Sequence, residues 1–137
     1  MIARRVAVFF YGLFMDAGVL RAKGLNPTHP RRAGVRGFAL RIGERAALVP
    51  DPDATVYGVL MDLSHDEIDR LYAEPTVSMY RAEAVIADLD DGSREAALCF
   101  NLPEPPAPND RNEDYAQRLR ELARRLNLPR EYVEGIR

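Results

Sequence analysis

Apolar residues near the start of the chain form one unbroken run, which predicts a strand buried on both faces. Residues 6–11 are β-branched or aromatic except for one alanine, and two arginines precede them. Gly12 interrupts the run; because an interior glycine weakens a strand, we expect a bend there. After the bend, Asp16 is placed to cap a short helix that reaches Leu20 and stops before Gly24.

The middle of the chain alternates apolar and polar side chains, the period of half-buried strands. Residues 26–32 are polar and contain two prolines, so we expect a loop. Residues 33–43 predict one strand, 46–49 a second and 55–61 a third, with a turn at 51–54. We expect consecutive strands of this kind to pair antiparallel.

Two local signals mark the elements that follow. Ser64 and Glu67 have the three-residue spacing of a capping box, which predicts a short helix ending near Tyr72. Further on, Asp91 and Gly92 separate two alternating runs, which is typical of a β-hairpin.

The last third of the chain joins a proline-rich connector to an amphipathic helix. Prolines within 103–108 favour an extended backbone. In the helix expected over about 112–127, one apolar stripe contains Tyr115, Leu119, Leu122 and Leu126. We expect this helix to lie against the sheet. With six or seven short strands, the pattern predicts an α+β fold: one domain over 1–137 with a small, mostly antiparallel curved sheet or barrel.

Composition narrows the classes of partner. The 137 residues are 47% hydrophobic and 29% charged, and 19 Lys and Arg against 21 Asp and Glu give a net charge of −2. This balance argues against a nucleic-acid surface, so the arginines of the last helix are expected to face solvent. No apolar run reaches the roughly 18 residues that a membrane span needs, so we expect no membrane partner. Composition does not fix the oligomeric state.

Cysteine content and the first residues bear on the compartment. A single cysteine, Cys99, excludes an internal disulfide framework and fits a reducing compartment. Two arginines followed by apolar residues resemble a signal peptide, but no small-residue cleavage site follows them. We therefore expect a cytoplasmic location.

The usual catalytic and metal-binding signals are missing from the sequence. His29, His65 and Cys99 lie in three different segments, so their spacing does not suit a metal site. Cys99, inside a predicted strand, is expected to pack as a small apolar side chain. There is no phosphate-binding loop, dinucleotide fingerprint or nucleophile elbow, and we expect neither metal nor cofactor.

Two features remain as candidates for chemistry. The backbone N–H groups around Gly12 lie where a strand meets a helix and could converge on an anion; the alternative is a plain tight turn. Glu74 precedes Pro75, which restricts its backbone to an extended shape. Apolar neighbours such as Tyr72 and Tyr80 would desolvate its carboxylate and raise its pKa into the range of a general acid or base. Alternatively, Glu74 is one of many solvated acids.

Several short motifs, in this order, resemble the gamma-glutamylcyclotransferase-like (AIG2-like) family. They are Y-G-L-F after the first strand, V-Y-G-V-L in a middle strand, L-Y-A-E-P after a short helix, and M-Y-R at the start of the hairpin. The resemblance spans about residues 6–101. It departs from the family pattern at Leu13, where Ser or Thr is common, at Pro75 in place of glycine, and at Phe100 in place of tyrosine.

The resemblance implies a small mixed β-barrel with flanking helices and one pocket. The implied pocket contains the tyrosine-glycine motif of Tyr11 and Gly12, with the backbone of Gly12, Leu13 and Phe14 binding the α-carboxylate or carbonyl of a glutamyl group. Glu74 would be the acid/base, and Tyr80 would hydrogen-bond the substrate or serve only as a strand residue. The implied activity is cofactor-independent cyclisation of a γ-glutamyl amide or γ-glutamylamine to 5-oxoproline. The alternative is a binding module that uses the same pocket without catalysis.

Overall fold

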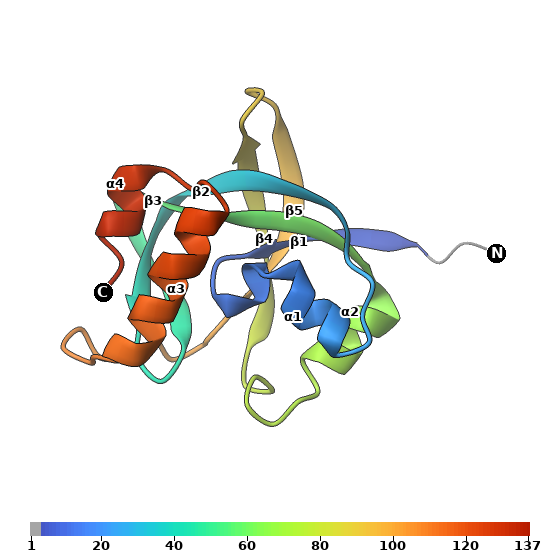
Figure 1. Ribbon diagram of the computed structural model, residues 1–137, viewed down its shortest axis with the longest axis horizontal. Helices are drawn as coiled ribbons and strands as arrows, with labels where there is room; N and C mark the ends of the chain where they lie inside the picture. Colours follow the sequence, from blue (N-terminus) through green and yellow to red (C-terminus); the bar gives the residue numbers. More distant parts are fainter. Residues whose placement is uncertain (1–3) are drawn as a thin grey trace.

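A closed five-stranded barrel with helices packed around it forms the body of the protein, in a computed structural model that describes residues 4–137 (Figure 1). The first three residues of the expected domain lie outside the described part. The elements, in chain order, are β1 (Arg5–Phe10), the 3-10 helix η1 (Leu13–Met15), α1 (Ala17–Ala22), β2 (Thr28–Ile42), β3 (Ala46–Ser64), α2 (His65–Leu71), β4 (Arg81–Leu89), β5 (Arg94–Asn101), α3 (Glu113–Arg125) and α4 (Arg130–Glu134).

The barrel is mixed because one strand pair is parallel. Strands follow the order β1, β3, β2, β4, β5 around the barrel, and β1 closes it by pairing parallel with β5 at Val8 and Phe9. All other pairs are antiparallel. The expected α+β fold, a small and mostly antiparallel barrel with flanking helices, is confirmed.

Strand boundaries in the middle of the chain differ from those expected. Five strands account for the barrel within the described residues, instead of six or seven. Residues 28–32, expected as loop, begin β2, and the expected turn at 51–54 lies inside β3. Pairing steps from Arg36 with Thr55 to Phe38 with Pro50, so 51–54 form a bulge within one long strand. A bulge leaves residues without ladder partners, so the proline within it removes no ladder bond.

The helix caps follow the sequence signals closely. Asp16 caps α1 by accepting a hydrogen bond from Gly18 N–H, and Gly24 has a positive φ of 85° after the helix. Ser64 and Glu67 form the expected capping box of α2. Asp91 and Gly92 lie in the turn between β4 and β5. α4 was not expected from the sequence.

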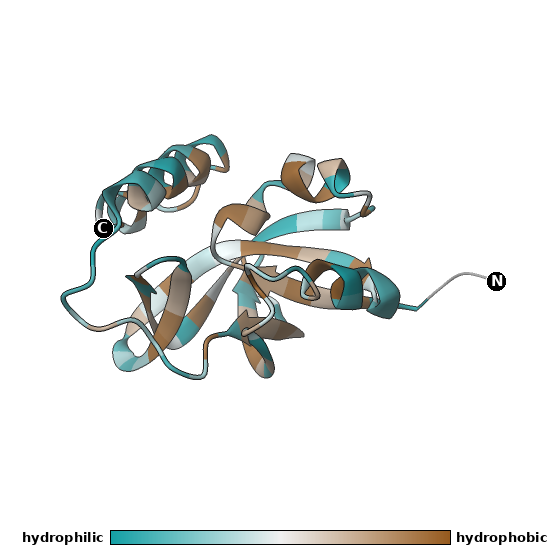
Figure 2. Ribbon diagram, turned by 90° about the horizontal axis from the view of Figure 1, so that it is seen from below, coloured by the Kyte–Doolittle hydropathy of each residue, from teal (hydrophilic) through white to brown (hydrophobic). Residues whose placement is uncertain are grey.

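The core fills the barrel and continues beneath α3. Val8, Leu60 and Leu63 from the barrel and Leu119 from α3 have no exposed surface. Figure 2 shows hydrophobic residues along the barrel strands and a mixture of hydrophobic and hydrophilic stripes on the helices. No helix among the described residues is long and apolar enough to cross a membrane.

Candidate functional site

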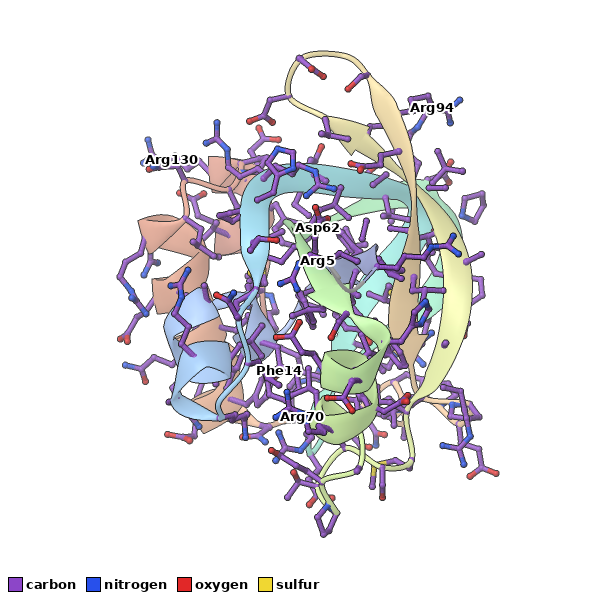
Figure 3. The ribbon with its side chains drawn as sticks, turned by 90° about the vertical axis from the view of Figure 1, so that its right-hand side faces the viewer. Arg5, Phe14, Asp62, Arg70, Arg94 and Arg130 are labelled. Carbon is purple, nitrogen blue, oxygen red and sulfur yellow. The ribbon has the colours of Figure 1, made fainter. Side chains whose placement is uncertain are left out.

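A cavity walled mainly by aromatic rings lies where β1 ends and η1 begins. The empty space here is about 450 Å³ including open solvent at the mouth, and the centre of a water-sized sphere can occupy about 50 Å³ of it. The lining residues are Phe9, Phe10, Tyr11, Gly12, Leu13, Phe14, Arg45, Ala46, Tyr72, Val77, Tyr80, Phe100 and Tyr115. Phe14 lies between α1 and α2 (Figure 3), and its ring meets that of Tyr72 edge to face, with centroids 6.2 Å apart. The structure thus brings together Tyr11, Gly12, Leu13, Phe14 and Tyr80.

The glycine at the bend makes room for a tyrosine from the C-terminal helix. A Cβ added to Gly12 would lie 2.7 Å from the hydroxyl oxygen of Tyr115 and 3.6 Å from the Ala46 Cβ. The backbone of Gly12 is extended, with φ −110°, so the side chain of another residue is excluded by crowding and not by backbone strain. Leu13 N–H reaches the Tyr115 hydroxyl oxygen at 3.4 Å. The chain therefore bends beside a polar group from a distant segment.

The tyrosine hydroxyls of the cavity are held in their neutral form. Tyr11 donates to the Phe100 carbonyl at 2.7 Å, and Tyr80 donates to the Ala46 carbonyl at 2.5 Å. Burial raises the pKa of Tyr11, Tyr72 and Tyr80 far above the usual tyrosine range. At neutral pH these hydroxyls are consequently hydrogen-bonding groups and cannot serve as anionic bases.

Glu74 lies outside the set of residues that lines the cavity. Its carboxylate oxygens accept hydrogen bonds from Lys23 Nζ at 2.8 and 3.0 Å, and about a third of each side chain is exposed. This differs from the expected apolar environment, because the turn after α2 presents Tyr72 to the cavity and Glu74 to the end of α1. Lys23 Nζ lies 5.8 Å from the centroid of the Phe14 ring, which places the ion pair beside the cavity wall.

Among the lining residues that the sequence analysis did not select, three carry a polar side-chain group: Tyr115, Tyr72 and Arg45. Tyr115 was assigned only to the apolar stripe of its helix, although a tyrosine in such a stripe brings a hydroxyl into the core. Tyr72, whose ring stacks on Phe100 at a centroid distance of 3.9 Å, was treated as a neighbour of Glu74. Arg45, in the turn between β2 and β3, carried no sequence signal that set it apart from the other arginines.

The remaining candidates for chemistry lie away from the cavity lining. Cys99 is buried, and burial raises the pKa of its thiol to about 12, so the sulfur stays protonated and unreactive. His29 is exposed, with Nδ1 3.8 Å from the Asp62 carboxylate, and His65 begins α2. Within residues 4–137, no group of three or more His, Cys, Asp or Glu side chains is arranged to hold a metal ion.

One known protein family matches the part of the chain that forms both the barrel and its cavity. The family model described as gamma-glutamyl cyclotransferase, AIG2-like, matches residues 8–119, which include every lining residue of the cavity. This chain belongs to the gamma-glutamyl cyclotransferase, AIG2-like family. No curated protein matches the chain.

Solved structures of the gamma-glutamyl cyclotransferase kind share the fold. A structure titled gamma-glutamyl cyclotransferase superposes with a TM-score of 0.78 at 18% identity, covering 97% of this chain and 86% of that one. An uncharacterised protein from Homo sapiens gives 0.76 at 20% identity, with coverages of 96% and 86%. An AIG2-like protein from Mus musculus gives 0.62 at 16% identity, with coverages of 81% and 90%. At these identities the likeness establishes the fold alone.

A double-mutant cycle tests why residue 12 is glycine. We expect Gly12→Ala to cost roughly 2 kcal/mol of folding free energy, because its Cβ would displace the Tyr115 hydroxyl. Tyr115→Phe removes that oxygen, so the double variant should recover about 1 kcal/mol relative to the sum of the single changes. Urea unfolding of the four proteins measures this coupling. Additive effects would show that the hydroxyl is not what excludes a side chain at residue 12.

Proposed function

We propose that this family member binds the glutamyl part of a γ-glutamyl amide or γ-glutamylamine in the aromatic cavity and cyclises it to 5-oxoproline. The proposal is supported above all by the tyrosine-glycine loop, Tyr11 to Phe14, which lines a cavity in a chain of this family. Tyr80 lines the same space from the start of the hairpin segment.

The reaction needs few protein groups because both reactants belong to one molecule. The α-nitrogen attacks the γ-carbonyl carbon, the bond from that carbon to the leaving nitrogen breaks, and the leaving amine departs. The α-ammonium gives up two protons and the leaving nitrogen takes up two, departing as an ammonium ion, so atoms and charge balance without water or an added nucleophile. Backbone N–H groups of the loop would stabilise the negative charge that develops on the carbonyl oxygen.

Glu74 is the proposed carrier of these protons. To reach the substrate, its carboxylate must leave Lys23 and turn past Phe14 toward the cavity. Partly exposed ion pairs contribute only about 0–1 kcal/mol, so this exchange of partners has a small energetic cost. Substrate with its α-ammonium group would offer Glu74 a new cationic partner.

Binding without turnover is the second candidate function, and one observation favours it. The lining contains no Asp, Glu, His or Lys side chain. Its tyrosines have raised pKa values and its arginine is permanently charged, so none of them accepts a proton at neutral pH. If Glu74 never leaves Lys23, the cavity holds a ligand but does not transform it.

One experiment separates the two functions. A panel of γ-glutamyl compounds is incubated with the wild type, Glu74→Gln, Lys23→Gln and Glu83→Gln, the last being the same change at an exposed glutamate on β4. We expect at least about a 100-fold loss of 5-oxoproline formation in Glu74→Gln, with binding by calorimetry retained. Lys23→Gln and Glu83→Gln should keep turnover.

The other outcomes are equally informative. Binding by the wild type without 5-oxoproline would favour the binding module. If Glu74→Gln turns over substrate at the rate of the wild type, Glu74 is excluded as the proton carrier. Absence of binding across the panel would contradict both candidate functions.

A further inference from the structure

Arg45 is a half-buried cation in the turn between β2 and β3. Its backbone is fixed locally, since its carbonyl accepts a hydrogen bond from Gly43 N–H at 3.1 Å. Its guanidinium, in contrast, makes no hydrogen bond or ion pair with any residue in the range 4–137. The part-buried arginines Arg5, Arg31 and Arg120 each pair with a carboxylate, so Arg45 differs from them.

Two spaces meet at Arg45. It lines the aromatic cavity, and it also lines an outer groove formed with Glu44, Pro75, Thr76, Met79, Tyr80, Arg81, Leu102, Pro103, Glu104, Pro105, Pro106 and Asp110. Besides Arg45, only Tyr80 borders both spaces. The groove includes an exposed methionine, Met79, and the proline-rich connector. Arg45 and Tyr80 therefore stand at the junction through which a ligand would pass.

The charge of Arg45 acts on the polar wall of the cavity. Burial raises the pKa of Tyr80 and Tyr115, and the Arg45 charge opposes that rise at both hydroxyls. Tyr80 precedes β4 and Tyr115 lies on α3, and the Tyr80 hydroxyl donates to the carbonyl of Ala46, the next residue in the chain after Arg45. Arg45 and both tyrosines line the cavity, so this cation and the two hydroxyls border the same space.

No carboxylate among residues 4–137 forms an ion pair with this cation. Glu44 and Glu104, which line the groove with Arg45, are exposed, and the Asp110 carboxylate accepts from Ala107 N–H. A cation beside an aromatic cavity without an internal counter-ion favours an anionic ligand. The planar guanidinium matches a carboxylate particularly well, since it can donate two parallel hydrogen bonds.

We propose that Arg45 binds the α-carboxylate of the ligand at the junction of cavity and groove, with Tyr80 and Tyr115 on either side. The γ-carbonyl oxygen is then left to the backbone N–H groups of Gly12 and Phe14, because Leu13 N–H donates to the Tyr115 hydroxyl; neutral donors of this kind stabilise developing charge. The identification of these two ligand groups as an α-carboxylate and a γ-carbonyl rests on the proposed function. The charge preference of the site does not depend on it.

Matched ligands test the proposal. Calorimetry compares a γ-glutamyl amide with its α-carboxamide analogue, and glutarate with glutaramide, on the wild type and three variants. Arg45→Gln removes the charge, Arg45→Lys keeps it without the planar fork, and Arg94→Gln is the control. Arg94 lies on β5, pairs with Asp88 and lines neither the cavity nor the groove.

We expect Arg45→Gln to weaken binding of the carboxylate ligands at least tenfold and to change carboxamide binding less than twofold. Arg45→Lys should fall between Arg45→Gln and the wild type, and Arg94→Gln should match the wild type. Circular dichroism of each variant verifies the fold. Equal effects of Arg45→Gln on charged and uncharged ligands would overturn the proposal, as would failure of the wild type to bind either carboxylate. Binding of glutarate alone, lost in Arg45→Gln, would keep the anion site and remove the γ-glutamyl function.

Discussion

Replacing Gly58 with alanine is expected to prevent stable folding of the barrel. A Cβ at this position in β3 would lie 2.1 Å from the carbonyl oxygen of Phe10 and 3.1 Å from its carbonyl carbon. These are backbone atoms of the neighbouring strand, so they cannot swing away as a flexible side chain does. We expect a loss of at least about 4 kcal/mol, in the exceptional range for single substitutions.

This change also bears on the cavity, because Phe10 is the last residue of β1 before the bend. Displacing its carbonyl would move the loop that begins at Tyr11. Urea unfolding, together with soluble yield and circular dichroism, measures the effect. Gly135→Ala is the matched control: its Cβ would make only ordinary contacts of 3.5 Å, and we expect a change within about 0.5 kcal/mol. If the Gly58→Ala protein is as stable as this control, β1 and β3 can move apart at little cost, and the prediction is wrong.

Local sequence signals predicted which elements occur in this fold better than they predicted the lengths of those elements. The apolar run at 6–11, the capping box of Ser64 and Glu67, and the Asp91-Gly92 turn each depend on neighbours in the chain, and each lies where it was expected. The bulge at 51–54 was read as a turn because its prolines and aspartates do suit turns. Only the pairing of β3 with β2 on both sides of the bulge makes it part of one strand.

The site could be predicted only in part, for a similar reason. Residues of the Tyr11 to Phe14 loop are neighbours in sequence, so one motif found them all. Tyr115 reaches the loop only because α3 folds back across the barrel, about a hundred residues later. Tyr72 and Glu74 are separated by one residue, and which of them faces the cavity depends on the turn that follows α2. No sequence pattern specifies that direction.

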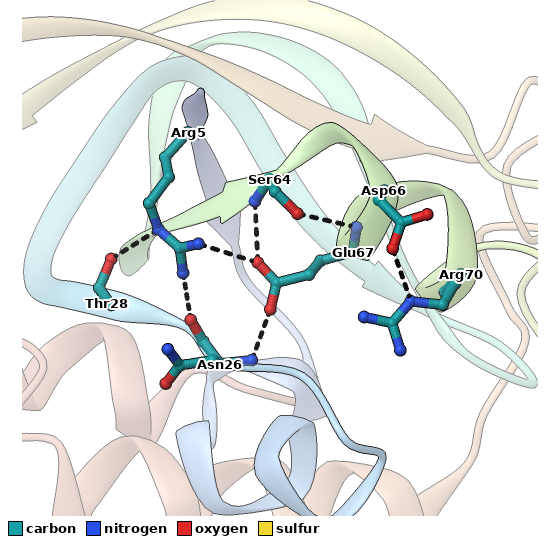
Figure 4. A network of polar contacts seen from close by, with 7 residues as sticks. All are labelled: Arg5, Asn26, Thr28, Ser64, Asp66, Glu67 and Arg70. Atoms are coloured by element: carbon teal, nitrogen blue, oxygen red, sulfur yellow. Dashed lines mark hydrogen bonds and ion pairs between the residues drawn. The ribbon is translucent and has the colours of Figure 1, made fainter. Parts of the chain in front are cut away.

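Removal of the Glu67 charge is expected to lower stability by about 3 kcal/mol at neutral pH, because it breaks a buried network of charged and polar groups. Only 6% of Glu67 is exposed. Its carboxylate accepts hydrogen bonds from Ser64 N–H at 2.9 Å, Asn26 N–H at 2.5 Å and the Arg5 guanidinium at 3.1 Å (Figure 4). Arg5 also donates to Thr28 and to the Asn26 carbonyl, so the network joins β1, the start of β2 and α2.

The same contacts determine how stability changes with pH. Burial alone would raise the pKa of Glu67, but the hydrogen bonds from Ser64 and Asn26 and the Arg5 charge hold it below the usual range. The unfolded chain therefore binds the proton more tightly, and Glu67 contributes its full stabilisation above the unfolded pKa of about 4.3. That contribution is lost as the pH falls from there through the lower pKa of the folded state.

Urea unfolding of the wild type and Glu67→Gln between pH 3 and pH 7 measures this contribution. We expect the difference in unfolding free energy to be largest near neutral pH and to shrink below pH 4.3, as the wild-type carboxylate gains its proton. Asp66→Asn is the control on the same helix, because Asp66 is exposed and pairs only with Arg70 at the surface; its effect should stay within about 0.5 kcal/mol. A difference for Glu67→Gln that did not vary with pH would show that volume or packing, and not charge, explains its effect.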